Sequence, residues 1–135
     1  RQDGAIFHID FSKFLGEIQR WKGFKRERAP FVLTPEFVYV FSEGDKDSPN
    51  FVRFVELCCD AYNALRQHAK LLTVMFELMI NSEITGLKDR SDLQHLSKAL
   101  CVDANEADAR QNFKNLIFDS LESISTRFNF AIHIL

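Results

Sequence analysis

The residues best suited to chemistry are an aspartate at the end of an apolar stretch and the basic segment that follows it. The first stretch reads FHIDFSKFLG, and its Asp10 follows Ile9 at the end of a predicted strand. In phosphoryl transfer, an aspartate at such a strand-to-loop junction holds the metal ion that bridges the nucleotide phosphates. The tripeptide Asp-Phe-Ser is weak evidence for a metal site by itself, because an aspartate that ends a strand and caps the next turn gives the same sequence pattern.

The second stretch, RWKGFKRER, concentrates positive charge in a chain whose formal net charge is -2. Its basic residues are Arg20, Lys22, Lys25, Arg26 and Arg28, against one acidic residue. Arginine forks in a glycine-containing loop suit phosphate oxygens. A run of this kind also occurs as a solvated face, a localisation signal or a nucleic-acid patch. Its place shortly after Asp10 favours a kinase loop that meets a phosphorylated or anionic substrate.

Length and composition bound the class of protein. The 135 residues suit one compact domain or a piece of a larger one. A content of 46% hydrophobic and 27% charged residues is normal for a soluble globular protein. The small net charge gives no global attraction to nucleic acid or to an anionic membrane, so any such attraction must be local. The longest strongly apolar run, at 71–76, is far shorter than the roughly 20 residues of a membrane span, and we expect a soluble intracellular protein.

Other reactive side chains do not form known motifs. The cysteines show neither a C-x-x-C motif nor paired metal spacing, and we expect buried free thiols in a reducing compartment at Cys58, Cys59 and Cys101. The histidines of the predicted helices lack a second ligand at metal spacing. Hydrolase, redox and P-loop functions have no supporting motif.

Turn signals and apolar patterns predict a little β structure ahead of a helical body. Asp3-Gly4 is a hairpin-type turn signal, and the apolar residues after it suit a buried strand. Because a strand needs a partner and almost no sequence precedes Asp3, we expect the chain to be a piece of a longer polypeptide. The polar and basic residues 17–30 predict a loop without regular structure.

Helical patterns dominate the rest of the chain. Thr34-Pro35-Glu36 predicts the start of a helix or turn, and 42–50 is predicted to be a loop. Apolar residues recur every three or four positions from Phe51 to Met79, which predicts one long helix or two helices with a break.

Two shorter signals follow. A short helix is predicted from Asp92 to Leu100. A capping box of Asp103 and Glu106 predicts the start of a last helix. The fold class predicted is therefore α+β and mainly α, with a short β-hairpin and a loop followed by a helical body.

Three segments together resemble a known family. FHIDFSKFLG, KRERAPFVLT and FVELCCDAYNALRQHAKLL, in this order and spacing, resemble the phosphoinositide 3-kinases over essentially the whole chain. The resemblance implies the C-lobe of a lipid/protein-kinase-like fold, with a strand at 1–9, the activation loop at 10–34 and the helical C-lobe at 35–135. The family's glycine-rich loop, phosphate-binding lysine and catalytic loop are missing here. The resemblance therefore implies that the chain is a fragment that starts just after the catalytic loop, and that it is inactive alone.

Within the family the chain looks most like class II. DFSKFLG, KRERAPF, GDK at 44–46 and LCCDAYN at 57–63 are similar to class II patterns. Class I enzymes usually place histidine at the Lys13 position and a denser lysine cluster around 18–22, where this chain reads IQRWK. A poorer basic box implies a substrate headgroup with fewer phosphates, either phosphatidylinositol or its 4-phosphate.

The resemblance also implies roles for single residues. Asp10 becomes the magnesium ligand, Ile9 a wall of the nucleotide pocket, and Lys13 a neutralising charge near the transferred phosphoryl. The headgroup contacts implied are Lys25, Arg26 and Arg28, with Arg20 and Lys22 as a weaker supplement. The reaction implied is in-line transfer of the ATP γ-phosphoryl to the inositol 3-hydroxyl, with ATP and Mg²⁺ as cofactors.

The partners implied are a phosphoinositide lipid in a membrane surface and the rest of the kinase domain, namely its N-lobe and catalytic loop. Nucleic acid and a transmembrane segment are not expected. The location implied is cytoplasmic, with peripheral association to endosomal or plasma membranes.

One departure from the family keeps an alternative open. Ser12 stands where the family has glycine, which permits backbone angles that cost most other residues free energy. The metal ligand remains, but the balance between active and inactive loop positions is expected to change. A catalytically impaired, kinase-like scaffold is therefore the alternative function. A protein kinase of the related group is a third, against which the cationic loop argues.

Overall fold

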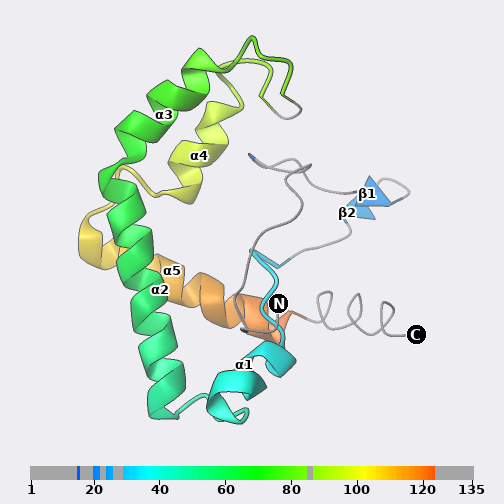
Figure 1. The fold of residues 1–135 in the computed structure, drawn as a ribbon, viewed down its shortest axis with the longest axis vertical. Helices are drawn as coiled ribbons and strands as arrows, with labels where there is room; N and C mark the ends of the chain where they lie inside the picture. Colours follow the sequence, from blue (N-terminus) through cyan, green and yellow to red (C-terminus); the bar gives the residue numbers. More distant parts are fainter. Residues whose placement is uncertain (1–14, 16–19, 22–23, 26–28, 85–86, 124–135) are drawn as a thin grey trace, which may run out of the picture.

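The computed structural model describes residues 15, 29–84 and 87–123, together with the backbone of 20–21 and 24–25. This part of the chain is mainly helical (Figure 1). Its elements are β1 (Arg20–Trp21), β2 (Phe24–Lys25), α1 (Pro35–Ser42), α2 (Pro49–Gln67), α3 (Ala69–Leu78), α4 (Leu93–Ala99) and α5 (Glu106–Glu122). The prediction of a mainly helical body is confirmed, whereas the hairpin and strand predicted at 1–9 lie outside the described residues.

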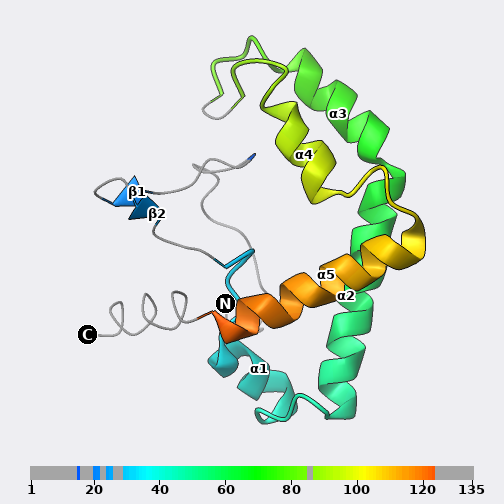
Figure 2. The same cartoon turned by 180° about the vertical axis from the view of Figure 1, so that it is seen from behind.

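The helices are arranged around α2 and α3. These two follow one another along the long axis of the molecule, as both views show (Figures 1 and 2). Helix α5 lies across α2, α1 packs against α2, and α4 returns beside α3. The sequence predicted either one long helix or two helices with a break, and the structure has the two helices. The break falls at His68, whose φ of -101° and ψ of 10° depart from helical values.

The start of α5 differs from the prediction. The N-cap is Asn105, whose side-chain oxygen accepts a hydrogen bond from the Asp108 backbone N–H at 2.9 Å. The capping box of Asp103 and Glu106 was wrong, because Asp103 lies in the turn before the helix. Asparagine and aspartate are equally good N-caps, so the type of residue did not decide between the two positions.

Two predicted loops are also shorter than expected. Residues 17–30 were predicted to lack regular structure, but β1 and β2 form a short antiparallel pair within them. The predicted loop at 42–50 loses Ser42 to α1 and its last two residues to α2. Ser48 caps α2 by accepting a hydrogen bond from the Phe51 N–H at 3.2 Å, and Pro49 follows at the first helical position, where its missing N–H costs nothing.

The buried apolar residues form two clusters. The first, called the loop-end core, consists of Leu33, Val38, Phe51, Val55, Cys59, Ile117 and Leu121. The second, called the turn core, consists of Tyr62, Ala69, Leu100 and Ala109. Phe113 packs against both clusters and stacks on Tyr62 with ring centroids 4.3 Å apart. One aromatic ring on α5 therefore joins the two cores.

An ion-pair network on the surface supplements the packing of α2 on α5. The Arg110 guanidinium from α5 pairs with the Glu56 carboxylate and, at 2.6 Å, with that of Asp60. Lys114 reaches the other oxygen of Glu56 at 2.6 Å. Hydrogen bonds from Lys114 and Arg110 lower the pKa of Glu56 below its ordinary value of 4.5. The charged form of Glu56 is therefore favoured in the folded chain.

This network predicts a pH dependence of folding. Because the folded-state pKa of Glu56 lies below the unfolded value, its contribution is present above pH 4.5 and is lost as the pH falls through the lowered pKa. We expect Glu56→Gln to remove part of the fall in unfolding free energy below pH 4.5, measured by urea unfolding followed by circular dichroism. The control Glu122→Gln, at an exposed position outside the network, should keep the original acid profile. Identical acid profiles for both variants would contradict the prediction. Added salt should reduce the effect because the paired side chains are partly exposed to solvent.

Candidate functional site

Most of the predicted site lies outside the described residues. This applies to the predicted metal, nucleotide and phosphoryl-neighbouring residues and to three of the basic residues: Ile9, Asp10, Lys13, Lys22, Arg26 and Arg28. Their roles stay predictions. In the described part of the chain, no group of three or more histidine, cysteine or acidic residues could hold a metal ion.

The remaining two predicted headgroup residues are brought together by backbone pairing. In the antiparallel pair of β1 and β2, Arg20 is the partner of Lys25 and Trp21 is the partner of Phe24. Directly opposed residues of antiparallel strands have Cα atoms about 4.5–5.5 Å apart. Two basic positions that are five apart in the sequence thus become neighbours, which concentrates positive charge along one short ribbon.

The end of the predicted activation loop is fixed to the helical body. Phe31 packs against the loop-end core, and its ring lies 6.1 Å from that of Phe113 between centroids. Leu33 is 8% exposed and Thr34 is 1% exposed, whereas Val32 between Phe31 and Leu33 is 59% exposed. Phe31 and Leu33 face the core while Val32 between them faces solvent, as in an extended segment with one face on a core, and the buried Thr34 follows as the N-cap residue of α1. The loop therefore ends at a rigid anchor directly before α1.

The thiols near this anchor are poor nucleophiles. Cys59 is fully buried in the loop-end core, and Cys58 beside it is half-buried. Burial raises the pKa of both thiols above their ordinary value. Since the thiolate is the reactive form, both residues act as packing groups. None of the three cysteines forms a disulfide, as predicted, but the prediction that they are buried is confirmed only for Cys59, because Cys58 and Cys101 are partly exposed.

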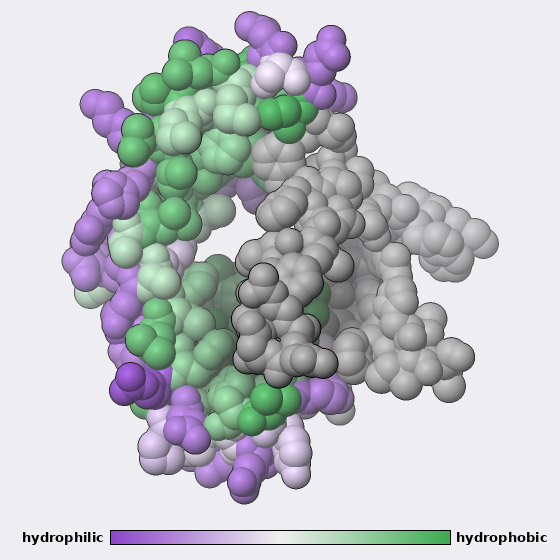
Figure 3. Space-filling model, viewed as in Figure 1, coloured by the Kyte–Doolittle hydropathy of each residue, from purple (hydrophilic) through white to green (hydrophobic). Residues whose placement is uncertain are grey.

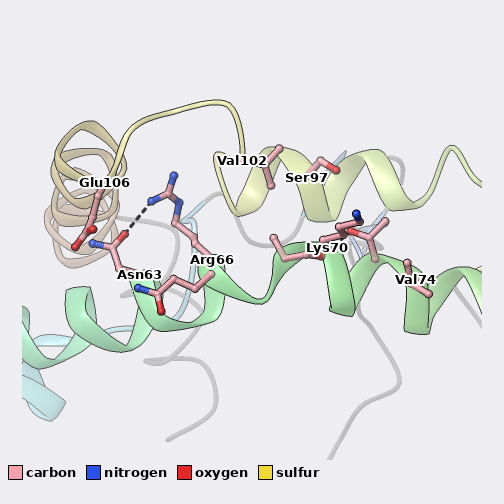
Figure 4. Close-up of a pocket in the computed structure, with 10 residues that line it drawn as sticks. Asn63, Arg66, Lys70, Val74, Ser97, Val102 and Glu106 are labelled. Carbon is pink, nitrogen blue, oxygen red and sulfur yellow. Dashed lines mark hydrogen bonds between the residues drawn. The ribbon is translucent and has the colours of Figure 1, made fainter.

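A groove that the sequence did not reveal lies at the other end of α2. It has a volume of about 570 Å³ and is bounded by the end of α2, the first half of α3, α4 and the start of α5 (Figure 4). At its floor the Arg66 guanidinium donates hydrogen bonds to the carbonyl oxygens of Leu100, Cys101 and Ala104 at 2.8, 3.0 and 2.6 Å. The lining residues come from segments far apart in the sequence, so no local pattern indicated the groove.

Comparison with known proteins identifies the family. The family model described as "Phosphatidylinositol 3- and 4-kinase" matches residues 1–89. This match covers the predicted activation loop, the anchor at Leu33 and helices α1 to α3. The chain belongs to the phosphatidylinositol 3- and 4-kinase family.

Curated relatives narrow the resemblance. The chain is 48% identical to "Phosphatidylinositol 3-kinase 3" of Dictyostelium discoideum, over 98% of this chain and 8% of that protein. It is 46% identical to "Phosphatidylinositol 4-phosphate 3-kinase C2 domain-containing subunit alpha" of Pongo abelii, over 100% of this chain and 8% of that protein. The human subunit beta of the same description is 46% identical over 98% of this chain and 8% of its own length. The resemblance to phosphoinositide 3-kinases, with C2 domain-containing enzymes among them, is confirmed, and the chain spans about a twelfth of these relatives.

If Leu33 anchors the loop, substitutions of Leu33 and of its neighbour Val32 should have different effects on local stability. Leu33→Ala removes a buried side chain from the loop-end core and should cost about 2–5 kcal/mol of local stability. We expect faster amide hydrogen exchange at residues 29–38 in this variant. The control Val32→Ala changes a side chain that is 59% exposed and should alter stability by no more than about 0.5 kcal/mol. Equal exchange in the two variants would show that Leu33 does not anchor the loop.

Proposed function

We propose that this chain is part of a phosphoinositide 3-kinase catalytic domain that transfers the ATP γ-phosphoryl to the inositol 3-hydroxyl of phosphatidylinositol or phosphatidylinositol 4-phosphate. The observation that carries the proposal is the basic segment from Arg20 to Arg28, which follows Asp10 and leads into the anchored loop end. The match to the kinase family supports it. So do the relatives, whose names state 3-kinase activity on phosphatidylinositol or its 4-phosphate.

The residues of the loop divide the work of the reaction. Asp10 supplies a carboxylate oxygen, the donor type that Mg²⁺ prefers, and Mg²⁺ commonly binds through one or two carboxylates together with substrate phosphates. An ion held there would supply positive charge to offset the negative charge of the nucleotide phosphates. Ile9 borders the nucleotide, and Lys13 places positive charge near the transferred group. Catalysis of this kind rests mostly on positioning and electrostatics.

The basic residues hold the lipid headgroup. Lys25 and Arg26, with Arg28, contact its phosphates, and Arg20 and Lys22 add a weaker attraction. Pairing of β1 with β2 supports this role because it sets Arg20 beside Lys25. The anchor at Leu33 supports it as well, since it holds the far end of the loop against the helical body.

The surroundings of the site follow from the same proposal. The described helices form the C-lobe, and the N-lobe and catalytic loop come from the rest of the parent protein. None of the helices in the described residues is both long and apolar enough to cross a bilayer. We infer a cytoplasmic enzyme that reaches its lipid at the surface of endosomal or plasma membranes.

The basic loop predicts a separation between lipid and nucleotide binding. Replacing both Lys25 and Arg26 by alanine in the full-length parent should raise KM for the phosphatidylinositol 4-phosphate of lipid vesicles by about tenfold or more, because a charged hydrogen bond contributes about 1.5–3 kcal/mol. KM for ATP should change little. The measurement is a radiometric lipid kinase assay on vesicles that contain one phosphoinositide at a time.

The same assay carries its own controls. Asp10→Asn should abolish turnover of every headgroup, since it removes the proposed metal ligand. Wild-type protein should prefer phosphatidylinositol and its 4-phosphate to the 4,5-bisphosphate. Unchanged lipid KM in the double variant, or phosphorylation of a peptide in place of lipid, would overturn the proposed function.

Ser12 favours a second candidate, a kinase-like domain of reduced activity that serves as a scaffold. Glycine permits backbone angles that serine adopts only at a cost. If Ser12 impairs the loop, Ser12→Gly in the full-length parent should raise lipid turnover at least several-fold without changing KM for ATP. If the enzyme is fully active, this substitution should leave turnover unchanged. Ser12→Ala provides the matched control, because alanine lacks the hydroxyl but keeps the Cβ.

A further inference from the structure

One aromatic ring on α5 connects the end of the predicted activation loop with α2. The partly buried Phe113 stacks on Tyr62, with ring centroids 4.3 Å apart and an angle of 6° between the ring planes. The ring of Phe31, at the end of the loop, lies 6.1 Å from that of Phe113 and is tilted by 36°. Both pairs are close enough for aromatic rings to attract one another. Phe113 therefore contacts the loop end and α2 at the same time.

The partner of Phe113 on α2 is itself held in place. Tyr62 is 8% exposed, and its hydroxyl donates a hydrogen bond to the Ala99 carbonyl oxygen at 2.9 Å. Its ring is therefore fixed by burial at one end and by a hydrogen bond to the end of α4 at the other. Because Phe113 stacks on this fixed ring, it offers Phe31 a surface whose position is set by the helical body.

The side chains from Phe31 to Thr34 hold the loop end by packing. Phe31 and Leu33 contact the loop-end core, whereas the hydroxyl of Thr34 is buried without a hydrogen-bond partner among the described residues. This segment runs beside the last turns of α5 in both ribbon views (Figures 1 and 2). The space-filling view shows apolar residues gathered where α1 and α2 meet, around the same core (Figure 3). The anchor of the loop thus depends on the shapes of apolar side chains.

The length of chain between the anchor and the basic residues limits how far those residues can move. Arg28 lies three positions before Phe31, so an extended chain places their Cα atoms at most about 11 Å apart. Lys25 lies six positions before Phe31, which allows at most about 22 Å. Asp10 is far more distant along the chain, and the anchor does not restrict it in this way. An anchored Phe31 therefore confines the proposed headgroup-binding residues and leaves the proposed metal ligand free of this restraint.

We propose that Phe113 is a positioning residue for lipid recognition, which acts through Phe31 on the basic end of the activation loop. Groups that are confined before binding lose less conformational entropy when the ligand arrives, which increases affinity. Phe113 thus promotes binding of the headgroup phosphates without contacting them, and binding of the nucleotide does not depend on it. This inference rests on the proposed function, because it assigns a support to the residues that the proposal places at the headgroup.

Kinetics of the full-length parent on phosphatidylinositol 4-phosphate vesicles test the role of Phe113. Phe113→Leu keeps an apolar side chain but removes the ring, and should raise KM for the lipid by about two- to tenfold, the range expected for loss of an aromatic pair. KM for ATP should stay unchanged. Phe113→Tyr keeps the ring and should retain the wild-type KM for the lipid. A lower kcat with unchanged lipid KM in Phe113→Leu would overturn the proposal, because it would show a general loss of active structure.

A second position on α5 provides the matched control. The ring of Phe118 lies 6.0 Å from that of Phe51 and is 39% exposed. Phe118→Leu therefore makes the same chemical change on the same helix, beside the same core, without touching the pair of Phe113 and Phe31. It should leave KM for the lipid unchanged, while circular dichroism confirms that both leucine variants are folded. An equal rise of the lipid KM in Phe118→Leu would overturn the proposal.

A double-mutant cycle tests whether Phe113 acts through Phe31. Phe31→Leu alone should raise KM for the lipid about as much as Phe113→Leu does, and the double variant should show little further rise, since both changes remove one contact. Independent effects whose free energies add would overturn the proposed route. Amide hydrogen exchange at residues 29–34 should become faster in both single variants, and unchanged exchange would overturn the proposal as well.

The double alanine variant of Lys25 and Arg26 separates this inference from the proposed function. If that variant raises KM for the lipid but Phe113→Leu does not, the inference is wrong and the proposed function stands. If the double alanine variant leaves KM for the lipid unchanged, the proposed function fails and the inference fails with it. The expected result is a raised lipid KM in both variants, with wild-type KM for ATP.

Discussion

The arrangement of the helices depends on the guanidinium of Arg66. Helix α4 ends with carbonyl groups that have no partner within the helix, and the chain must then turn toward α5. Arg66 satisfies the carbonyls of Leu100, Cys101 and Ala104 at once, from the last turn of α2. Hydrogen bonds to a charged group contribute about 1.5–3 kcal/mol each, so this one side chain fixes where α5 can begin. The five donors of its planar fork allow this one side chain to serve these three carbonyls and the Asn63 Oδ1 as well.

The position of α5 in turn determines where the end of the predicted activation loop packs. Phe113 stacks on Tyr62 on the side of the turn core and lies beside Phe31 on the side of the loop-end core. A shift of α5 would therefore move the surface on which Phe31 and Leu33 rest. The groove near Arg66 and the end of the loop belong to one packed unit, although the chemistry proposed for the chain lies in the loop alone.

The sequence predicted what depends on local pattern and missed what depends on distant partners. Apolar spacing indicated α2, α3 and the last helix, because each helix buries one face. The capping box failed because Asp103 and Asn105 have equivalent acceptors. The strands β1 and β2 have two residues each, which is too short for an alternating apolar pattern to be recognised in the sequence. The sequence did not indicate the role of Arg66 either, since the carbonyl groups that it binds are 34–38 residues away along the chain. Asp10 and the basic loop came from a motif shared with a family, and the proposed roles of residues 9–28 rest on that motif.

The described helices α1 to α5 contain none of the residues that are predicted to hold the metal, the nucleotide or the headgroup. Burial raises the pKa of the Cys58 and Cys59 thiols, and the ion pair of Arg110 and Glu56 links α5 to α2. Several large apolar side chains remain exposed on α1 as well as on α3, with Tyr39 at 65% and Val40 at 83%. Burying such surface stabilises a protein by about 25 cal/mol per Å². Covering the exposed apolar side chains of α1 and α3 with other protein would therefore add stability to the described helices.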